Sequence, residues 1–148
     1  MGNRVLAIQQ AQAFAVEITV TSSAIPNNTQ TGGAITAAAV GDVLVDDIIL
    51  ETDSTGLAGP TNINFTTNNA KGLTGASNPV VAQAVSGLGA NKTISCKAEA
   101  TTKHLPFVIE DTKKLFLSGS SAGGTGAGKV RITLLCRKVV GNPALVSA

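Results

Sequence analysis

Lys129-Val-Arg-Ile-Thr-Leu-Leu-Cys-Arg-Lys-Val-Val140 is the stretch that decides the fold class. Read with a period of two, it places apolar side chains on one face, namely those of Val130, Ile132, Leu134, Cys136 and Val140. The opposite face is mostly polar, and Leu135 is an apolar residue on it. Alternation over this length predicts a β-strand with one face on a core and the other toward water or a partner subunit.

The residues just upstream predict that this strand is the second arm of a β-hairpin. Lys113–Leu117 is another β-run, and Ser118–Gly128 between the two runs is rich in glycine. Two β-runs joined by a glycine-rich reversal are typical of a hairpin.

Two further long strands are predicted before this hairpin. Residues 13–21 alternate cleanly, and the face predicted to lie on the core holds Phe14, Val16, Ile18 and Val20. Residues 42–52 contain two apolar triplets separated by Asp46-Asp47, and the alternation fails across this acidic pair. A β-bulge at the pair restores the register, and a turn there is the alternative.

Shorter segments complete the predicted set of elements. Residues 35–40, 62–66, 92–100 and 105–109 are predicted strands, with Ile94, Cys96 and Ala98 inward in the third and Pro106 marking the start or an edge in the last. Residues 79–86 suit a short helix and a strand equally. Residues 22–34 and 67–78 read as long surface loops.

These elements predict an all-β fold. The chain has 148 residues, which one domain accommodates, and its 16 Gly favour strands and turns over packed helices. We therefore predict a single-domain antiparallel β-sandwich or jelly-roll-like barrel with long loops. Its expected parts are an N-terminal arm (residues 1–12), the sandwich or barrel (residues 13–140) and a loose C-terminal tail (residues 141–148).

Composition argues against several classes of partner. The net charge is +2 and no basic run exceeds two residues, so nucleic-acid binding has little support. No apolar run approaches the roughly 18 residues of a membrane span, and Val5–Ile8 is too short for a signal-peptide core. Without an export signal, Cys96 and Cys136 are expected to be buried free thiols, and a disulfide between them is the less favoured alternative.

No motif in the chain predicts catalysis or a cofactor. Gly123–Lys129 matches the spacing of a phosphate-binding loop, but Val130 replaces the required Ser or Thr and a strand follows where a helix is needed. His104, the only histidine, has no recognisable nucleophile motif beside it. We therefore predict a protein that is not an enzyme and that holds no cofactor and no metal.

Acidic residues concentrate in one stretch, which contains Asp42, Asp46, Asp47, Glu51 and Asp53. The calcium-loop spacing is absent from it, so a cation site is the weaker interpretation. An acidic rim that meets a basic patch on a neighbouring subunit is the stronger one.

Two stretches, Gly41–Gly56 and Lys114–Val139, resemble small structural proteins of tailed bacteriophages. In particular, the chain is similar to head decoration (cement) proteins, although the likeness covers less than a third of it. The resemblance implies a β-rich fold, a homotrimer or other symmetric oligomer, and contact with the major capsid protein on the outside of the phage head. It implies a virion protein made in the host cytoplasm and carries over no catalytic residues.

The arm and the first long loop are the expected contact segments. Both are long, uncharged apart from Arg4, and mixed in polarity, as interface rims are. The candidate interface residues are Arg4, Val5, Leu6, Ile8, Ile25, Pro26, Asn27 and Leu135. The alternative function is a tail or fibre module that binds a host receptor or another virion protein, although a chain with four Phe and no Trp or Tyr has few aromatic side chains to expose. An enzyme acting through His104 and an acid ranks third.

Overall fold

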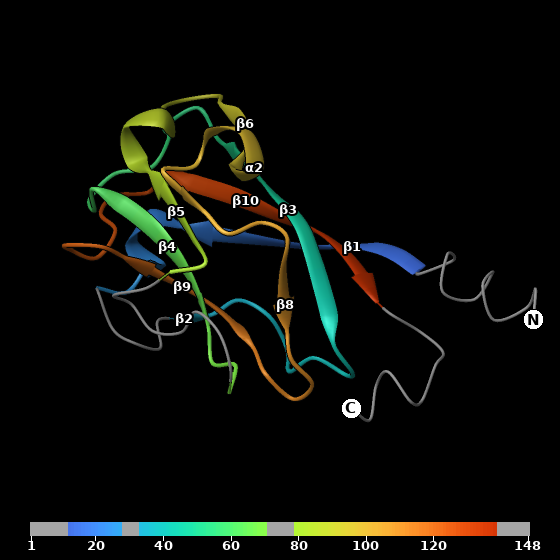
Figure 1. Cartoon of the computed structure of the whole chain (residues 1–148). Coiled ribbons are helices and arrows are strands. Elements are labelled where there is room, and N and C mark those ends of the chain that lie inside the picture. Colours follow the sequence, from blue (N-terminus) through green and yellow to red (C-terminus); the bar gives the residue numbers. More distant parts are fainter. Residues whose placement is uncertain (1–11, 28–32, 71–78, 139–148) are drawn as a thin grey trace, which may run out of the picture.

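The computed structural model describes residues 12–27, 33–70 and 79–138, which form two facing antiparallel sheets (Figure 1). Sheet A has the order β1-β10-β3, and both β6 and β8 pair with the far edge of β3. Its strands are β1 (Gln12–Thr21), β3 (Val43–Thr52), β6 (Thr93–Ser95), β8 (Phe107–Ile109) and β10 (Lys129–Lys138).

Sheet B has the order β2-β9-β4-β5-β7. Its strands are β2 (Gly33–Ala34), β4 (Asn62–Thr67), β5 (Val81–Ala84), β7 (Thr102–Lys103) and β9 (Leu115–Gly119). Three short helical turns, η1 (Ser22–Ala24), η2 (Val85–Gly87) and α2 (Cys96–Glu99), interrupt the described segments. The all-β sandwich is confirmed, and the described strands do not close into the barrel that was its alternative. The predicted arm and tail lie outside the described residues, apart from Gln12.

The central strand of sheet A is β10, and it has the predicted alternation. Val130, Ile132, Leu134 and Cys136 are buried, and the residues between them are exposed or half-buried. The strand pairs along its whole length with β1 on one side and from Val130 to Lys138 with β3 on the other. The inward side chains meet those of sheet B in one core, where burial of each large aliphatic residue contributes roughly 1.5–3 kcal/mol.

The predicted hairpin is wrong. Strand β9 pairs with β2 and β4 in sheet B, whereas β10 lies in sheet A, so residues 120–128 cross from one sheet to the other. The glycines in this crossover serve close backbone packing. A Cβ on Gly124 would lie 1.7 Å from the carbonyl oxygen of Ser22, and one on Gly128 would lie 1.7 Å from that of Gly56. Any side chain at either position would displace the backbone.

The predicted bulge in β3 is confirmed. Leu135 is opposite Asp47 and Cys136 is opposite Val45, so Asp46 is an extra residue without a partner on β10. The bulge resets the alternation, and both Val45 and Ile48 therefore face the core.

The predicted strand 92–100 is only partly correct. Strand β6 ends at Ser95, and residues 96–99 form α2. The reason is a set of side-chain acceptors: Ser95 Oγ accepts a hydrogen bond from the Ala98 N–H at 3.3 Å, and Asp47 Oδ1 accepts one from the Lys97 N–H at 2.9 Å. Cys96 is buried as expected, but Ala98 is exposed.

Two other segments differ from expectation or resolve an ambiguity. Residues 79–86 contain β5 and the start of η2, so the strand alternative holds there. Residues 35–40 form no strand, because β2 ends at Ala34. The segment still follows sheet B, since the Ile35 and Ala39 N–H groups donate to the Leu115 and Lys113 carbonyls at 2.9 and 2.8 Å.

Candidate functional site

The predicted interface residues fall into three groups. Arg4, Val5, Leu6 and Ile8 lie outside the described residues. Pro26 is half-buried and Asn27 is exposed beside the end of β9, where Asn27 forms an isolated bridge with Gly119. Leu135 is 40% exposed on β10, so its predicted place on the outer face is correct.

Ile25 corrects the prediction. Only 2% of its surface is exposed, and it belongs to the hydrophobic core. The surface loop expected at residues 22–34 is bonded to the rest of the domain at its start, because the Ser22 N–H donates to the Gly128 carbonyl at 2.7 Å. Consequently the side chain of Ile25 is packed in the core of the monomer, and we remove Ile25 from the candidate interface.

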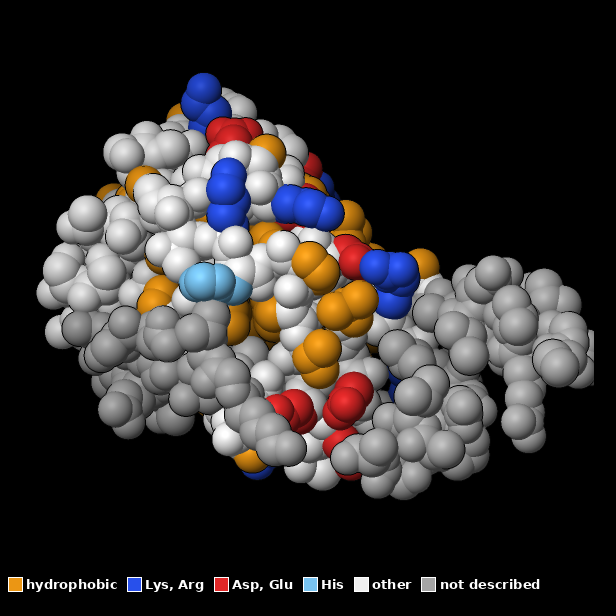
Figure 2. Space-filling model, viewed as in Figure 1, with side chains coloured by type: hydrophobic (Ala, Val, Ile, Leu, Met, Phe, Trp, Pro, Cys, Tyr) orange, Lys and Arg blue, Asp and Glu red, His pale blue; other side chains and the backbone are white. Residues whose placement is uncertain are grey.

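An apolar patch lies on the outer side of sheet A. We call it the sheet A face, and its members are the outward-facing Ala13, Ala15, Leu44, Ile49, Val108 and Leu135. Leu135 and Val108 are its most exposed large residues, at 40% and 39%. Figure 2 shows hydrophobic side chains gathered over β8 and β3, with acidic and basic side chains beside them. Such a centre of aliphatic groups with charged neighbours is typical of a protein-binding surface.

Ion pairs border the sheet A face. Arg137 binds Asp46 through two nitrogens, with Nε–Oδ2 and Nη2–Oδ1 distances of 2.7 and 2.6 Å. Arg131 binds Glu51, with an Nε–Oε2 distance of 2.7 Å. The hydrogen bond from Arg137 lowers the pKa of Asp46 below its usual value, because it stabilises the charged carboxylate.

Most of the acidic stretch is engaged in bonds within the monomer, and its contact with a basic patch on a neighbouring subunit stays a prediction. Asp46 and Glu51 are paired as described, and Asp47 holds the start of α2. Asp53 accepts hydrogen bonds from three backbone N–H groups, which lower its pKa: those of Thr55 at 2.9 Å, Gly56 at 3.0 Å and Lys129 at 3.0 Å. These carboxylates are therefore used inside the monomer.

The described residues offer no arrangement suited to metal chemistry. No group of three or more His, Cys, Asp or Glu side chains among them could hold a metal ion. Both cysteines are buried and free, as expected. Burial raises the pKa of Cys96 to about 12 and that of Cys136 to about 11, so neither thiol is an activated nucleophile. In the described part of the chain, every helix is too short to cross a bilayer.

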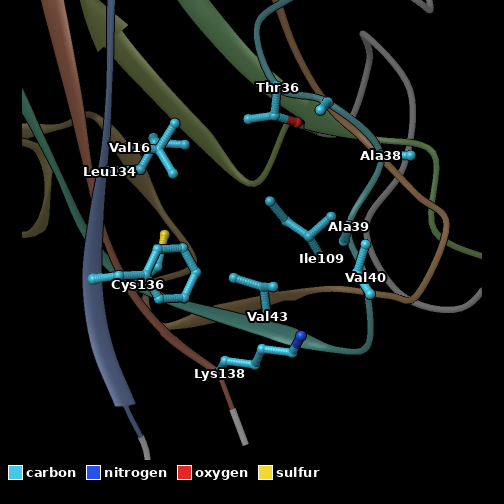
Figure 3. Close-up of a pocket in the computed structure, with 12 residues that line it drawn as sticks. Val16, Thr36, Ala38, Ala39, Val40, Val43, Ile109, Leu134, Cys136 and Lys138 are labelled. Atoms are coloured by element: carbon cyan, nitrogen blue, oxygen red, sulfur yellow. The ribbon is translucent and has the colours of Figure 1, made fainter.

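An apolar groove of about 300 Å³ opens at one edge of the sandwich, between β1 and the segment after β2 (Figure 3). Phe14 and Val16 form one wall, and residues 36–40 form the opposite one. Cys136 lies in the floor, and Lys138 and Val43 lie at one end. Phe14 was expected in the core, but it is 37% exposed because it belongs to an edge strand beside this opening.

Sequence reasoning missed the groove. The groove exists because the inward face of β1 extends past the edge of sheet B. The side chains of β1 alternate in the same way whether or not sheet B covers them, so the alternation does not indicate the opening. One signal was available: Ala37-Ala38-Ala39 supplies only methyl groups opposite Phe14, too little volume to fill the space between two sheet edges.

No protein-family model matches the sequence, and no curated protein matches it. Solved structures do match the fold. A chain in the capsid of Ralstonia phage GP4 superposes with a TM-score of 0.57 at 13% identity, covering 88% of this chain and 86% of that one. A chain in the capsid asymmetric unit of cyanophage Pam1 gives a TM-score of 0.42 at 16% identity, covering 86% of this chain and 84% of that one. The fold of this chain is therefore one that also occurs in a phage capsid, which agrees with the resemblance drawn from the sequence.

Proposed function

We propose that this chain is a non-enzymatic structural protein of a phage virion, and that it decorates and stabilises the outside of the head. The observation that carries the proposal is the fold shared along most of both chains with a component of a phage capsid. The sequence resemblance to decoration proteins, drawn from β3 and β10, supports it independently.

The sheet A face is the docking surface in this proposal. Leu135 still exposes 40% of its surface, and burial of that remainder against a partner contributes about 1 kcal/mol per copy. The neighbouring Arg137–Asp46 pair is satisfied within the monomer, so docking leaves no isolated charge. A modest gain per copy is enough when several copies bind one shell, because avidity multiplies it.

The partners in this proposal are the major capsid protein and further copies of this chain, arranged as a homotrimer or another symmetric oligomer. The N-terminal arm, with Val5, Leu6 and Ile8, reaches from the start of β1 to a neighbouring subunit. It holds no Gly, Pro, Asn or Asp between Arg4 and Gln12, so it has no residue suited to a tight return onto its own domain.

A binding assay on heads that lack this protein tests the proposal. Purified chain is added, the heads are sedimented, and bound protein is quantified, together with the temperature at which the heads break open. The wild-type chain should bind and raise that temperature. Failure to bind heads, with binding to host cells instead, would favour the tail or fibre alternative.

Three variants locate the contact. Deletion of residues 1–12 should abolish binding and leave the circular dichroism spectrum unchanged. Leu135→Asp should weaken binding at least tenfold, because it places a charge in the centre of the apolar patch. Thr125→Asp adds the same charge at an exposed position of the crossover before β10, outside the sheet A face, and should bind normally. Equal binding by all three would refute the assigned surfaces.

A further inference from the structure

Strand β1 is the one long edge strand in the described part of the sandwich (Figure 1). It has ten residues and, among the described elements, pairs only with β10, so every second residue directs its backbone N–H and C=O away from the sheet. The other described edge strands are short: β2 and β7 have two residues each, and β6 and β8 have three each. A long row of unpaired backbone groups is a template for another strand.

β1 lacks most of the features that normally protect an edge strand. It contains no Pro, Gly or Lys, and its register with β10 runs from Gln12 to Thr21 without a bulge. Its one charged residue is Glu17, which lies on the outer face with its carboxylate 3.8 Å from the guanidinium of Arg131. The edge is therefore open to strand pairing.

The inner side chains of β1 are covered on one side only. These side chains are Phe14, Val16, Ile18 and Val20. Phe14 is 37% exposed and the other three are half-buried, whereas the four residues opposite them on β10 are buried. A strand added beyond β1 would remove this apolar row from water, as β1 does for the row on β10.

The partner that fits this edge is a second copy of β1. Among the described strands, only β1 is both free along one edge and long enough to pair with ten residues. Two identical strands that pair antiparallel about a two-fold axis make the same contacts from both sides, and two-fold dimers are the commonest soluble oligomers.

The side chains select the register of this pairing. With Glu17 on the axis, two like charges lie directly opposite each other, which is destabilising. An axis at Ala15 or Ile18 pairs a shorter stretch of the two strands. With Val16 on the axis, residues 12–20 of both strands pair and no like charges are opposite.

We propose that two copies of this chain join their β1 strands antiparallel, with Val16 on the two-fold axis, into one sheet that runs through both sandwiches. Phe14 then packs against Ile18 of the partner copy on the inner face, and Glu17 is opposite Ala15 of the partner copy on the outer face. The pairing goes beyond the proposed function, which assigns no strand to the contact between copies. It concerns the isolated chain, so its test does not depend on head binding.

Solution mass and charge variants test the pairing. Light scattering on the wild-type chain should give the mass of two chains. Ala15→Glu places a carboxylate opposite each Glu17 and should raise the dimer dissociation constant about fivefold, whereas Ala15→Lys should lower it by about the same factor. Ala13→Glu is the matched control: it adds the same charge at an exposed position opposite Thr19 of the partner copy and should change the constant by less than about twofold.

Cysteine trapping tests the register. Ala13→Cys combined with Thr19→Cys in one chain should form disulfides between two chains under mild oxidation, because position 13 is opposite position 19 in the proposed register. Either single variant should stay unbonded, because identical positions are then six residues, or about 20 Å, apart along the strands. Cys96 and Cys136 are buried, with pKa values raised to about 12 and 11, so they react slowly and can remain.

Each outcome decides the proposal. A dimer whose affinity follows the sign of the charge at position 15, and whose chains bond between positions 13 and 19, supports it. A monomer at every concentration, a trimer, a missing bond, a bond formed as readily by a single variant, or equal affinities for Ala15→Glu and Ala15→Lys overturns it.

Discussion

Replacement of Asp47 by alanine should destabilise the sandwich far more than replacement of its neighbour Asp46. The two carboxylates are adjacent at the β3 bulge but bind different partners. Asp47 Oδ2 accepts a hydrogen bond from Ser95 Oγ at 2.5 Å, and Asp47 Oδ1 accepts one from the Lys97 N–H at 2.9 Å. These bonds join the bulge to the end of β6 and the start of α2, about fifty residues along the chain. Asp46 only pairs with Arg137 on the surface.

The magnitude follows from the number and kind of bonds lost. A hydrogen bond to a charged group contributes roughly 1.5–3 kcal/mol, and because Asp47 is half-buried the lower end of this range applies. Loss of its two long-range bonds should therefore cost about 2–3 kcal/mol. Loss of the exposed Asp46–Arg137 pair should cost about 0.2–1 kcal/mol.

Urea unfolding followed by far-ultraviolet circular dichroism measures both values, which suits a chain without Trp or Tyr. The corresponding fall in the thermal midpoint is about 5–10 °C for Asp47→Ala and a few degrees at most for Asp46→Ala. If Asp46→Ala costs as much as Asp47→Ala, or if Asp47→Ala costs less than about 1 kcal/mol, the role assigned to Asp47 at the bulge is refuted.

Three other predictions follow from the described contacts. Gly128→Ala should cost several kcal/mol or prevent folding, because its Cβ would overlap a backbone carbonyl, whereas Gly89→Ala meets nothing within 4 Å and should be neutral in the same urea titration. Backbone N–H donors hold the pKa of Asp53 below its usual value, so its contribution to stability is present above pH about 4 and is lost as the pH falls through the lowered pKa. Asp53→Asn should therefore lower the thermal midpoint more at pH 6 than at pH 2.5, and an equal difference at both values would contradict this. Cys96 and Cys136 should resist a maleimide reagent at pH 8 in the folded chain and react at once in urea; rapid labelling without urea would contradict their burial.

Local pattern was sufficient for the long strands. The alternation in β1 and β10 predicted both elements and their inward faces, because a period of two has one geometric solution when one side of a strand is buried. The failure of alternation at Asp46-Asp47 predicted the bulge for the same reason. The two free thiols also followed from their positions on inward faces.

The candidate site was predictable only in part. Leu135 was recognisable as an apolar residue on a polar face, and it is exposed. The rest of the sheet A face comes from three other strands, whose register with β10 no local pattern contains. Ile25 shows the opposite error: the sequence predicted an exposed loop residue, but its side chain is buried in the core.

The sequence by itself determined that this chain is an all-β domain, where its long strands lie and which of their faces turn inward, because those properties depend on neighbours along the chain. Tertiary structure alone decided which sheet each strand joins, why residues 96–99 turn helical, and where the groove opens. Those outcomes depend on groups far apart in sequence: the carbonyls of Ser22 and Gly56 that require glycine in the crossover, and the carboxylate of Asp47 that caps α2. Such long-range contacts form only when the sheets pack, and they then override the local preference of the residues they join.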